Sequence, residues 1–309
     1  MKILMLGAGG VGGYLAAKLV PAGHTVSILA RGTHLEAIRD GGLRFVDGEI
    51  ETIVHPVAAS DRLSDLPSAD LAVFAVKGQD LPELIDMYRP HADAQTLMLP
   101  FQNGVDAPDL LASAFGEENT LIGVARIFSN ITAPGVVTQY GGTSSFTVGD
   151  FKGDQSSPGV RNGIQVWRAA GIRAPDCADV LVVRWQKFLL FDAVSGRTAG
   201  ARCRFHEIRQ NPELLDFFRG LAAEVDAVGR ARGVALPPDA VEQTMHFWSR
   251  LPDEARSSTA HDLESGKPLE VDWICGAVAR MGRESGVPTP NSTAVAALLS
   301  PWRGGNQSV

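Results

Sequence analysis

The sequence predicts an α/β protein in which a parallel-sheet domain comes first and an all-helical domain follows. Short apolar runs alternate with helix-like segments over the first half, and the periodicity becomes helical for long stretches after Ala178. The length of 309 residues exceeds what one hydrophobic core usually organises, so two domains are expected. The predicted domains are residues 1–176 and 177–309.

Each element of the first domain rests on its own pattern. The expected strands are Lys2–Leu6, Thr25–Ala30, Leu71–Ala75 and Thr96–Leu99, and the expected helices are Val11–Val20, Leu81–Tyr88 and Asp109–Ala114. Leu43–Val57 is rich in Val, Ile and Thr around the turn signal Asp47-Gly48, which predicts a hairpin or a pair of edge strands. The β-like runs of Gly123–Gly149 are expected to extend the same sheet. In the second domain the expected helices are Val180–Ala201, Pro212–Arg232, Pro238–Trp248 and Val271–Ser285.

Composition excludes several classes of protein. A formal net charge of -7 without a basic run argues against nucleic acid as the main partner. No apolar run approaches the ~20 residues of a membrane span, and Ile3–Leu6 is too short for a signal-peptide core, so we expect a cytoplasmic protein. Three widely spaced cysteines and seven histidines without ligand spacing predict neither a disulfide framework nor a metal site.

A glycine-rich turn stands where the first predicted strand meets the first predicted helix. Gly7, Gly9 and Gly12 form the pattern Gly-x-Gly-x-x-Gly, which supplies a tight turn and a backbone that a pyrophosphate can approach. The following helix, from Val11, would direct its first amide groups at the phosphates. We therefore assign Gly7, Gly9, Gly10, Val11 and Gly12 to a dinucleotide site; the alternative is a flexible loop.

The end of the second strand bears on which nicotinamide cofactor is bound. An NAD site usually carries Asp or Glu there, to bind the ribose 2′-hydroxyl. Here the strand ends at Ala30-Arg31, and the planar guanidinium of Arg31 suits a 2′-phosphate. NADP(H) is therefore predicted; a solvated surface arginine and use of both cofactors are the alternatives.

Five separated motifs together resemble the ketopantoate reductase (2-dehydropantoate 2-reductase) family. They are Gly7–Gly13, Ala75-Val76-Lys77, Gln102-Asn103-Gly104, Trp185-Gln186-Lys187, and the stretch from Ser257-Ser258 to Leu269-Glu270-Val271-Asp272. The resemblance covers the chain to about Ala297. It implies NADPH-dependent reduction of a branched 2-oxo acid in pantothenate synthesis by a Rossmann domain and a helical domain similar to that of 6-phosphogluconate dehydrogenases. The active site would lie in the cleft between them, in a monomer or a homodimer.

Two residues are assigned to catalysis. Reduction of a 2-oxo acid needs a hydride donor, an acid for the developing alkoxide and groups that hold the carboxylate. The resemblance makes Lys187 the proton donor and Glu270 the residue that supports it. A solvated helix lysine and a surface glutamate at a helix start are the structural alternatives.

Three further residues are assigned to binding. Lys77 follows a strand at its carboxyl end, where it could reach cofactor phosphate or substrate carboxylate, unless it is only a loop-tip lysine. Asn103 could orient the nicotinamide carboxamide or a substrate oxygen, or Asn103-Gly104 could be only a turn. Ser258 resembles the family's substrate-binding serine, with a helix N-cap as the alternative.

The helix after Lys187 departs from the family pattern. Ketopantoate reductases usually carry asparagines four and eight residues after the lysine, where this chain has Phe191 and Ser195. Ser195 is kept as a substrate-binding candidate, whereas phenylalanine cannot hydrogen-bond a carboxylate, and Asp192 is expected at the surface. A larger or more apolar 2-oxo acid, a related ketone or an imine then becomes an alternative substrate. A non-catalytic NADP(H)-binding redox sensor is the alternative from another class.

Overall fold

The computed structural model describes residues 1–200, 203–253 and 257–306. The chain forms two compact units, one of Met1–Gln102 with Ala107–Val180 and one of Asn103–Asp106 with Leu181–Val309. The division therefore falls after Val180, whereas the sequence suggested residue 176, and a four-residue stretch, Asn103–Asp106, packs with the second unit. The first unit is α/β and the second is helical, as predicted.

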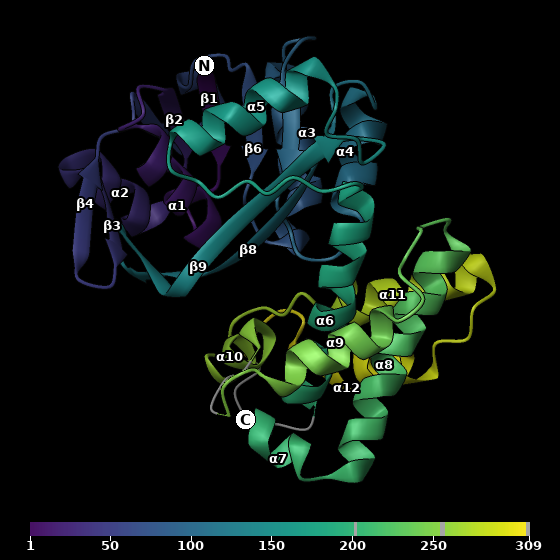
Figure 1. The fold of residues 1–309 in the computed structure, drawn as a ribbon. Helices are drawn as coiled ribbons and strands as arrows, with labels where there is room; N and C mark the ends of the chain where they lie inside the picture. Colours follow the sequence, from purple (N-terminus) through teal and green to yellow (C-terminus); the bar gives the residue numbers. More distant parts are fainter. Residues whose placement is uncertain (201–202, 254–256, 307–309) are drawn as a thin grey trace. The chain divides into compact units, whose positions relative to one another are not determined.

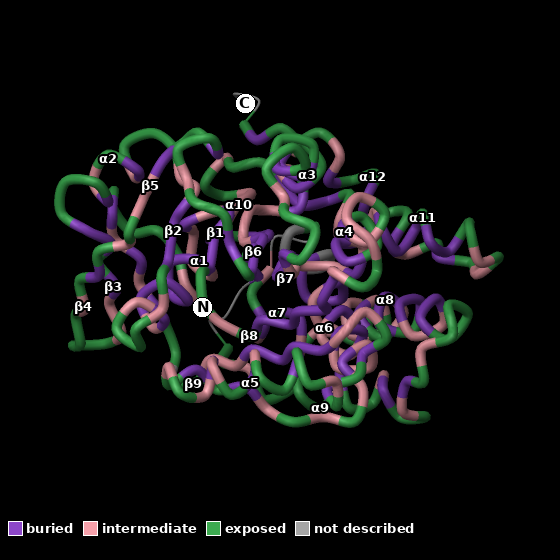
Figure 2. Tube along the Cα trace, turned by 90° about the horizontal axis from the view of Figure 1, so that it is seen from above, coloured by how far each residue is buried: buried purple, intermediate pink, exposed green. Residues whose placement is uncertain are grey.

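The first unit is built on a five-stranded parallel sheet (Figure 1). Its strand order is β5 (Ala58–Ser60), β2 (Thr25–Leu29), β1 (Lys2–Leu6), β6 (Leu71–Phe74) and β7 (Leu97–Pro100). The strands are apolar runs because both faces of such a sheet are covered, and Figure 2 shows β1, β2 and β6 as largely buried. β1 lies in the centre of the sheet, β2 and β5 follow on one side, and β6 and β7 lie on the other. This is the strand order of a Rossmann domain.

The first unit also contains helices. They are α1 (Gly10–Leu19), α2 (Gly32–Gly41), α3 (Leu81–Tyr88), α4 (Ala107–Phe115) and α5 (Pro158–Ala169), with short 3-10 turns η1 (Leu63–Asp65), η2 (Gly78–Asp80) and η3 (Arg89–His91). The three helices expected here are confirmed as α1, α3 and α4, while α2 and α5 were not expected.

A second, four-stranded sheet covers α1. Its order is β4 (Ile50–Val54), β3 (Leu43–Asp47), β9 (Val136–Asp150) and β8 (Leu121–Ala133). The hairpin expected within Leu43–Val57 is confirmed, because β3 and β4 pair antiparallel. The expectation that Gly123–Gly149 extends the first sheet is wrong, because β9 pairs with β3 and β8 instead.

The second sheet covers the side of α1 that the first sheet leaves open. Seven of the ten residues of α1 are buried, so the helix needs apolar cover on the side away from the first sheet. Tyr14 of α1 supplies contacts to that cover: its ring stacks on Phe146 of β9 at 5.2 Å and meets Phe45 of β3 edge-on at 5.6 Å. The hairpin and the later strands thus complete one core around the helix that starts at the glycine turn.

The second unit is a helical bundle organised around α8. Its elements are α6 (Val180–Gly200), α7 (Phe205–Arg209), α8 (Pro212–Ala231), α9 (Ala240–Ser249), α10 (Ser258–Glu264), η4 (Val271–Trp273), α11 (Cys275–Ser285), α12 (Pro290–Leu299) and η5 (Ser300–Trp302). α8 packs against α7, α9, α11 and α12. The four expected helices are confirmed, although the last begins as the 3-10 turn η4 and residue 201 lies outside the described residues.

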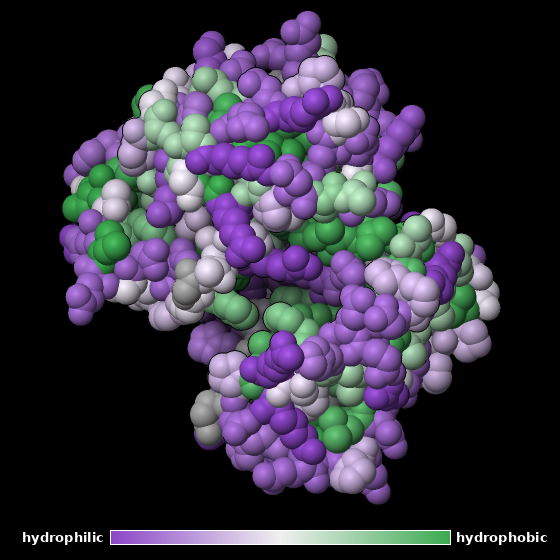
Figure 3. Space-filling view, in the orientation of Figure 1, coloured by the Kyte–Doolittle hydropathy of each residue, from purple (hydrophilic) through white to green (hydrophobic). Residues whose placement is uncertain are grey.

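Polar residues cover most of the face of each unit shown in Figure 3, and apolar residues form smaller patches on it. Over the described ranges, no helix combines the length and apolar character needed to cross a membrane. None of the three cysteines takes part in a disulfide within the part of the chain that the structure describes. In that same part, no three His, Cys, Asp or Glu side chains gather as metal ligands would.

Candidate active site

The glycine turn is shaped by close packing at two of its glycines and by open space at the third. Gly7 has a φ of 112°, and a Cβ there would approach the Ala75 backbone to 3.0 Å. A Cβ on Gly12 would overlap the Gly7 carbonyl oxygen, whereas a Cβ on Gly9 would meet nothing within 4 Å. Gly7 and Gly12 therefore let strand, turn and helix approach, and the space beside Gly9 can admit a ligand.

The start of α1 has a second constraint that the spacing did not reveal. A Cβ on Gly10 would overlap the backbone carbonyl of Ser129, because β8 crosses the beginning of the helix here. The hydroxyl of Ser129 is buried and has no hydrogen-bond partner among the described residues. No sequence spacing connects Ser129 with Gly10, so only the fold brings this hydroxyl to the turn.

The segment after β6 lies directly beside the glycine turn. A Cβ on Gly7 would also touch Val76, and Lys77 stands next in the chain as the N-cap of η2. The amide of Gln102 donates to the carbonyls of Phe74 at 3.0 Å and Val76 at 3.1 Å, which fixes this segment against the end of β7. The carboxyl ends of β1 and β6 are the point where the connections diverge, and ligands of open parallel sheets bind there.

Arg31 is the N-cap of α2, immediately after β2. Its side chain is 87% exposed and lies 3.8 Å from the carboxylate of Asp80 in η2. An ion pair at this exposure is weak, so an incoming phosphate can replace Asp80 as the partner of the guanidinium.

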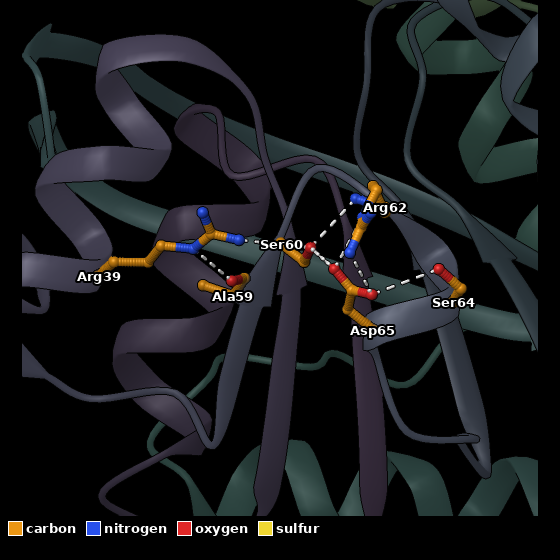
Figure 4. Close-up of polar contacts among 6 residues, drawn as sticks. All are labelled: Arg39, Ala59, Ser60, Arg62, Ser64 and Asp65. Carbon is orange, nitrogen blue, oxygen red and sulfur yellow. Dashed lines mark hydrogen bonds and ion pairs between the residues drawn. The ribbon is translucent and has the colours of Figure 1, made fainter.

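A polar cluster fixes the strand next to β2 (Figure 4). Ser60, at the end of β5, donates to Asp65 at 2.9 Å, and Arg62 donates to the same carboxylate through Nε and Nη2 at 3.0 Å each. Arg39 of α2 donates to the Ala59 carbonyl at 2.8 Å. Hydrogen bonds from Arg62 and Ser60 hold the pKa of Asp65 below its usual value. The opposite charges of Arg62 and Asp65 compensate each other, so the cluster supports the sheet edge beside Arg31.

Three predicted residues meet in the second unit. The Lys187 ammonium on α6 donates to Asn103 Oδ1 at 3.1 Å, and Asn103 Nδ2 donates to Glu270 Oε2 at 3.3 Å. Glu270 is only 8% exposed and Lys187 is half-buried. The amide of Asn103 accepts from the cation through its oxygen and donates to the anion through its nitrogen, so one uncharged side chain bonds both charged groups.

The loop that carries Asn103 is held at three points. A Cβ on Gly104, whose φ is 83°, would overlap the Trp273 carbonyl oxygen, so the loop packs tightly on η4. Arg184, one turn before Lys187, donates to the Gly104 carbonyl at 3.3 Å. Arg280 of α11 pairs with Asp106 at 2.7 Å. The alternative that Asn103-Gly104 is only a turn is therefore insufficient, because the turn carries an amide to Lys187 and Glu270.

Family profiles match both parts of the chain. The profile described as ketopantoate reductase PanE/ApbA matches residues 3–153, and the one for its C-terminal domain matches residues 179–302. The chain belongs to the ketopantoate reductase family. Members of this family are oxidoreductases.

Named relatives and solved structures of the family align over nearly the whole chain. The 2-dehydropantoate 2-reductase of Mesorhizobium japonicum is 30% identical over 97% of each chain, and that of Archaeoglobus fulgidus is 29% identical over 93% of this chain and 92% of its own. The structure of a PanE/ApbA family ketopantoate reductase from Ralstonia eutropha has a TM-score of 0.88, 29% identity and 98% coverage of both chains. D-mandelate dehydrogenase, solved with NADH and anilino(oxo)acetate, shares the fold with a TM-score of 0.88 at 19% identity over 98% of both chains.

Phe191 lies beside the lysine of this ketopantoate reductase family member. The Lys187 ammonium stands 5.6 Å from the centroid of the Phe191 ring, within the range of a cation–π attraction. The residue four positions after the lysine thus faces it, as helix geometry requires, and presents an aromatic face to the ammonium.

Ser195 and Asp192 of α6 are both buried in the helical unit. Ser195 is 2% exposed, and its hydroxyl has no hydrogen-bond partner among the described residues. The expectation that Asp192 lies at the surface is wrong: it is fully buried. Burial, and then the charge of Glu224, raise the pKa of Asp192 to about 8. Glu224 of α8 and Cys275 of α11 lie close enough to interact with Asp192, so these two helices bury a position that the sequence assigned to the surface.

Ser258 is exposed at the first position of α10. The N-cap is its neighbour Ser257, whose hydroxyl accepts from the Ala260 amide at 3.0 Å. Capping therefore does not use the Ser258 hydroxyl, and the substrate-binding assignment of Ser258 stays a prediction.

Proposed function

We propose that this protein is an NADPH-dependent reductase that converts a 2-oxo acid to a 2-hydroxy acid. The observation that carries this proposal is the hydrogen-bonded series Lys187, Asn103, Glu270, in which a cation suited to protonate an alkoxide is held by an amide and a carboxylate. Membership of the ketopantoate reductase family supports the same reaction class.

The first unit fits a dinucleotide. The space beside Gly9 and the amides at the start of α1 suit a pyrophosphate, and Arg31 suits a 2′-phosphate. Lys77 stands at the edge of the sheet where cofactor or substrate anions would bind. When bound there, NADPH would supply a hydride to the carbonyl carbon of the substrate.

The residues of the second unit supply the proton. Lys187 donates a proton from its ammonium to the carbonyl oxygen as that oxygen becomes an alkoxide, and the resulting amine regains a proton from water. The hydrogen bond to Asn103 Oδ1 fixes the direction of the ammonium, and Glu270 in turn fixes the Asn103 amide. We assign Ser258 and Ser195 to the substrate side, with Ser258 the more accessible hydroxyl.

The substrate side chain is where this protein would differ from ketopantoate reductases. The Phe191 ring beside Lys187 replaces a hydrogen-bonding amide with apolar surface. Ketopantoate carries a hydroxyl that needs a polar partner, so we expect a 2-oxo acid with a larger apolar or aromatic side chain to react faster.

One assay tests both parts of the proposal. Consumption of NADPH is followed spectroscopically with a panel of ketopantoate, aliphatic and aromatic 2-oxo acids, a simple ketone and a cyclic imine. We expect an apolar 2-oxo acid to give the highest kcat/KM, and Phe191→Asn to shift the preference about tenfold toward ketopantoate. Lys187→Ala should lower kcat about 100-fold or more with NADPH affinity nearly unchanged, because general acid catalysis contributes on that scale.

Lys152→Ala is the control for Lys187→Ala. It also removes one lysine charge, but at an exposed turn of the first unit, so kcat should stay near the wild-type value. A rate unaffected by Lys187→Ala would remove Lys187 from its assigned role. Tight NADPH binding without turnover on any compound would favour the redox-sensor alternative, and preferential turnover of the ketone or imine would replace the 2-oxo acid as substrate.

A further inference from the structure

His34 connects three segments of the first unit around the glycine turn. It lies on α2, is half-buried, and its Nε2 is 2.9 Å from the Ala8 carbonyl oxygen. The backbone N–H of Gly135, in the turn between β8 and β9, donates to His34 Nδ1 at 2.9 Å. The histidine therefore joins the glycine turn, α2 and the β8–β9 turn.

These two bonds define the protonation of the imidazole. A backbone N–H can donate only to a ring nitrogen that carries no proton, so Nδ1 is the acceptor. The single proton of the neutral ring is then on Nε2, which donates it to Ala8. Burial is the main cause that lowers the pKa of His34 from 6.5, against the opposing effect of the Ala8 bond.

The bond from His34 to the Ala8 carbonyl orients one peptide group of the glycine turn. In a planar trans peptide the C=O of Ala8 and the N–H of Gly9 point in opposite directions. With the carbonyl held toward His34, the Gly9 N–H is directed away from α2, and Gly9 is the glycine with open space beside it.

The bond to Gly135 anchors the hairpin that crosses the start of α1. The Gly135 carbonyl accepts from the Arg44 N–H at 2.9 Å, and a Cβ on Gly135 would approach Ala37 of α2 to 2.8 Å. The β8–β9 turn is thus fixed from three sides, and the β8 strand carries Ser129 to Gly10.

We propose that His34 is a positioning residue for the dinucleotide: its neutral imidazole, anchored through Nδ1 to the Gly135 N–H, holds the Ala8–Gly9 peptide so that the Gly9 N–H faces the pyrophosphate. Protonation of Nδ1 breaks the bond to Gly135, so the ring is no longer fixed against the β8–β9 turn and cofactor binding weakens. This inference rests on the proposed dinucleotide site. His34 itself does not touch the reacting atoms.

The pH dependence has a defined sign. Below the pKa of His34 the Nδ1 atom gains a proton and faces the Gly135 N–H, so two donors oppose each other and the bond is lost. Affinity for the cofactor falls as the pH falls, by up to about tenfold per pH unit below that pKa. The segments that bond His34, Gly7–Gly13 and 133–136, carry no ionisable side chain. The charged residues of the packed elements are Glu36, Arg39 and Asp40 on α2, Arg31 at its N-cap, and Arg44 and Asp47 on β3. None of them is among the causes of the lowered pKa of His34, which are burial and the opposing Ala8 bond.

Two substitutions separate the two bonds. His34→Gln places an amide nitrogen at the distance of Nε2 along the side chain, so it can keep the donation to Ala8 without titrating. His34→Asn places an oxygen near the position of Nδ1, so it can keep the acceptor for Gly135 and loses the bond to Ala8.

The experiment measures the Kd of NADP⁺ and NAD⁺ by calorimetry for the full-length wild type and both variants between pH 8 and pH 5. NAD⁺ is included because the 2′-phosphate of NADP⁺ titrates with a pKa near ~6. We expect the wild-type Kd to rise at least about fivefold relative to that of His34→Gln as the pH falls, for both nucleotides. His34→Asn should bind weakly at every pH, and the ¹⁵N spectrum of the wild type should show the Nε2–H tautomer of His34 at pH 8.

The outcomes distinguish this inference from the function on which it rests. Parallel pH profiles for the wild type and His34→Gln would overturn the positioning role while leaving the proposed reductase intact. If the folded wild type bound neither nucleotide at any pH, the proposed function would fail and this inference with it.

Discussion

Asn103 shows how much one side chain can contribute when it joins two charged groups. Its amide accepts from the Lys187 ammonium and donates to the Glu270 carboxylate. Aspartate could not donate to Glu270, and a second carboxylate there would repel it. Asn103 is therefore a positioning residue for Lys187 in addition to the binding role that the sequence suggested.

Arg31 is the residue on which the cofactor prediction depends. We expect Arg31→Asp to shift the ratio of NADPH to NADH affinity about 10- to 100-fold toward NADH, because it removes a charged hydrogen-bond donor from the 2′-phosphate and supplies an acceptor for a ribose hydroxyl. Titrations of both reduced nucleotides measure the ratio.

Arg62→Ala is the matched control for that variant. Arg62 is also exposed and lies at the neighbouring strand end, but its guanidinium is paired with Asp65. Removal of the Arg62 side chain should change the ratio of NADPH to NADH affinity by no more than about twofold, because an exposed ion pair contributes little free energy. An Arg31→Asp variant with wild-type selectivity would disprove the assignment of Arg31 to the 2′-phosphate. The predicted preference for NADP(H) would then have no residue assigned to it.

At the scale of elements, the glycines of the turn have separate roles. Gly10 is required by the crossing of β8 over α1, whereas Gly9, with a φ of -72°, has open space and an ordinary backbone conformation. Gly10 thus serves the packing of the protein, and Gly9 leaves open the space in which we propose that the dinucleotide binds.

This separation predicts opposite effects of two alanine substitutions. Gly10→Ala should lower the free energy of unfolding by about 1–3 kcal/mol, because the new Cβ overlaps the Ser129 carbonyl. Gly9→Ala should leave stability within about 1 kcal/mol and weaken cofactor binding at least about tenfold. Urea unfolding and nucleotide titration of both variants measure the two effects, and equal loss of affinity without loss of stability in both would refute the distinction.

Element positions were predictable where the pattern was local. The strands β1, β2, β6 and β7 were expected within one or two residues of their ends, since each is an apolar run bounded by turn residues. The place of β8 and β9 was not, because pairing partners far apart in the chain are chosen by which face of α1 remains to be covered. Likewise, no local pattern associates Asn103–Asp106 with the helical unit, since contacts with Arg184, Trp273 and Arg280 decide it.

At the scale of the whole molecule, Asp192 links stability to pH. Its side chain is fully buried, neither carboxyl oxygen has a hydrogen-bond partner among the described residues, and Glu224 lies near it. Glu224 in turn accepts from the Asn291 N–H, the Ser292 N–H and the Ser292 hydroxyl at 2.6–2.8 Å at the start of α12. Asp192 accepts no such bond among the described residues, and its burial beside Glu224 raises its pKa.

The folded protein should therefore lose stability as the pH rises. The pKa of Asp192 is about 8 in the folded chain and about 3.9 in an unfolded one, so the folded state binds the extra proton throughout this interval. The free energy of unfolding should fall with rising pH by up to about 1.4 kcal/mol per pH unit, and the contribution is present in full only at low pH.

Asp192→Asn supplies the reference for that measurement, because an amide of the same shape does not titrate. Urea unfolding of both proteins at pH 5, 6, 7 and 8 should show the stability of the wild type falling relative to the variant. Parallel curves would mean that Asp192 titrates normally in the fold, whatever the absolute stability of the variant.

The sequence by itself determined the order of the two units and the position of the glycine turn, because these depend on residue type and on local periodicity. Through its resemblance to the ketopantoate reductases it also singled out Lys187, Asn103 and Glu270 as candidate site residues. Tertiary structure alone decided that the Asn103 amide bridges Lys187 and Glu270, that β8 constrains Gly10, that His34 bonds the glycine turn, and that Asp192 is buried. The physical reason is that hydrogen-bond partners and desolvation depend on distances between groups remote in the chain, which local patterns do not specify.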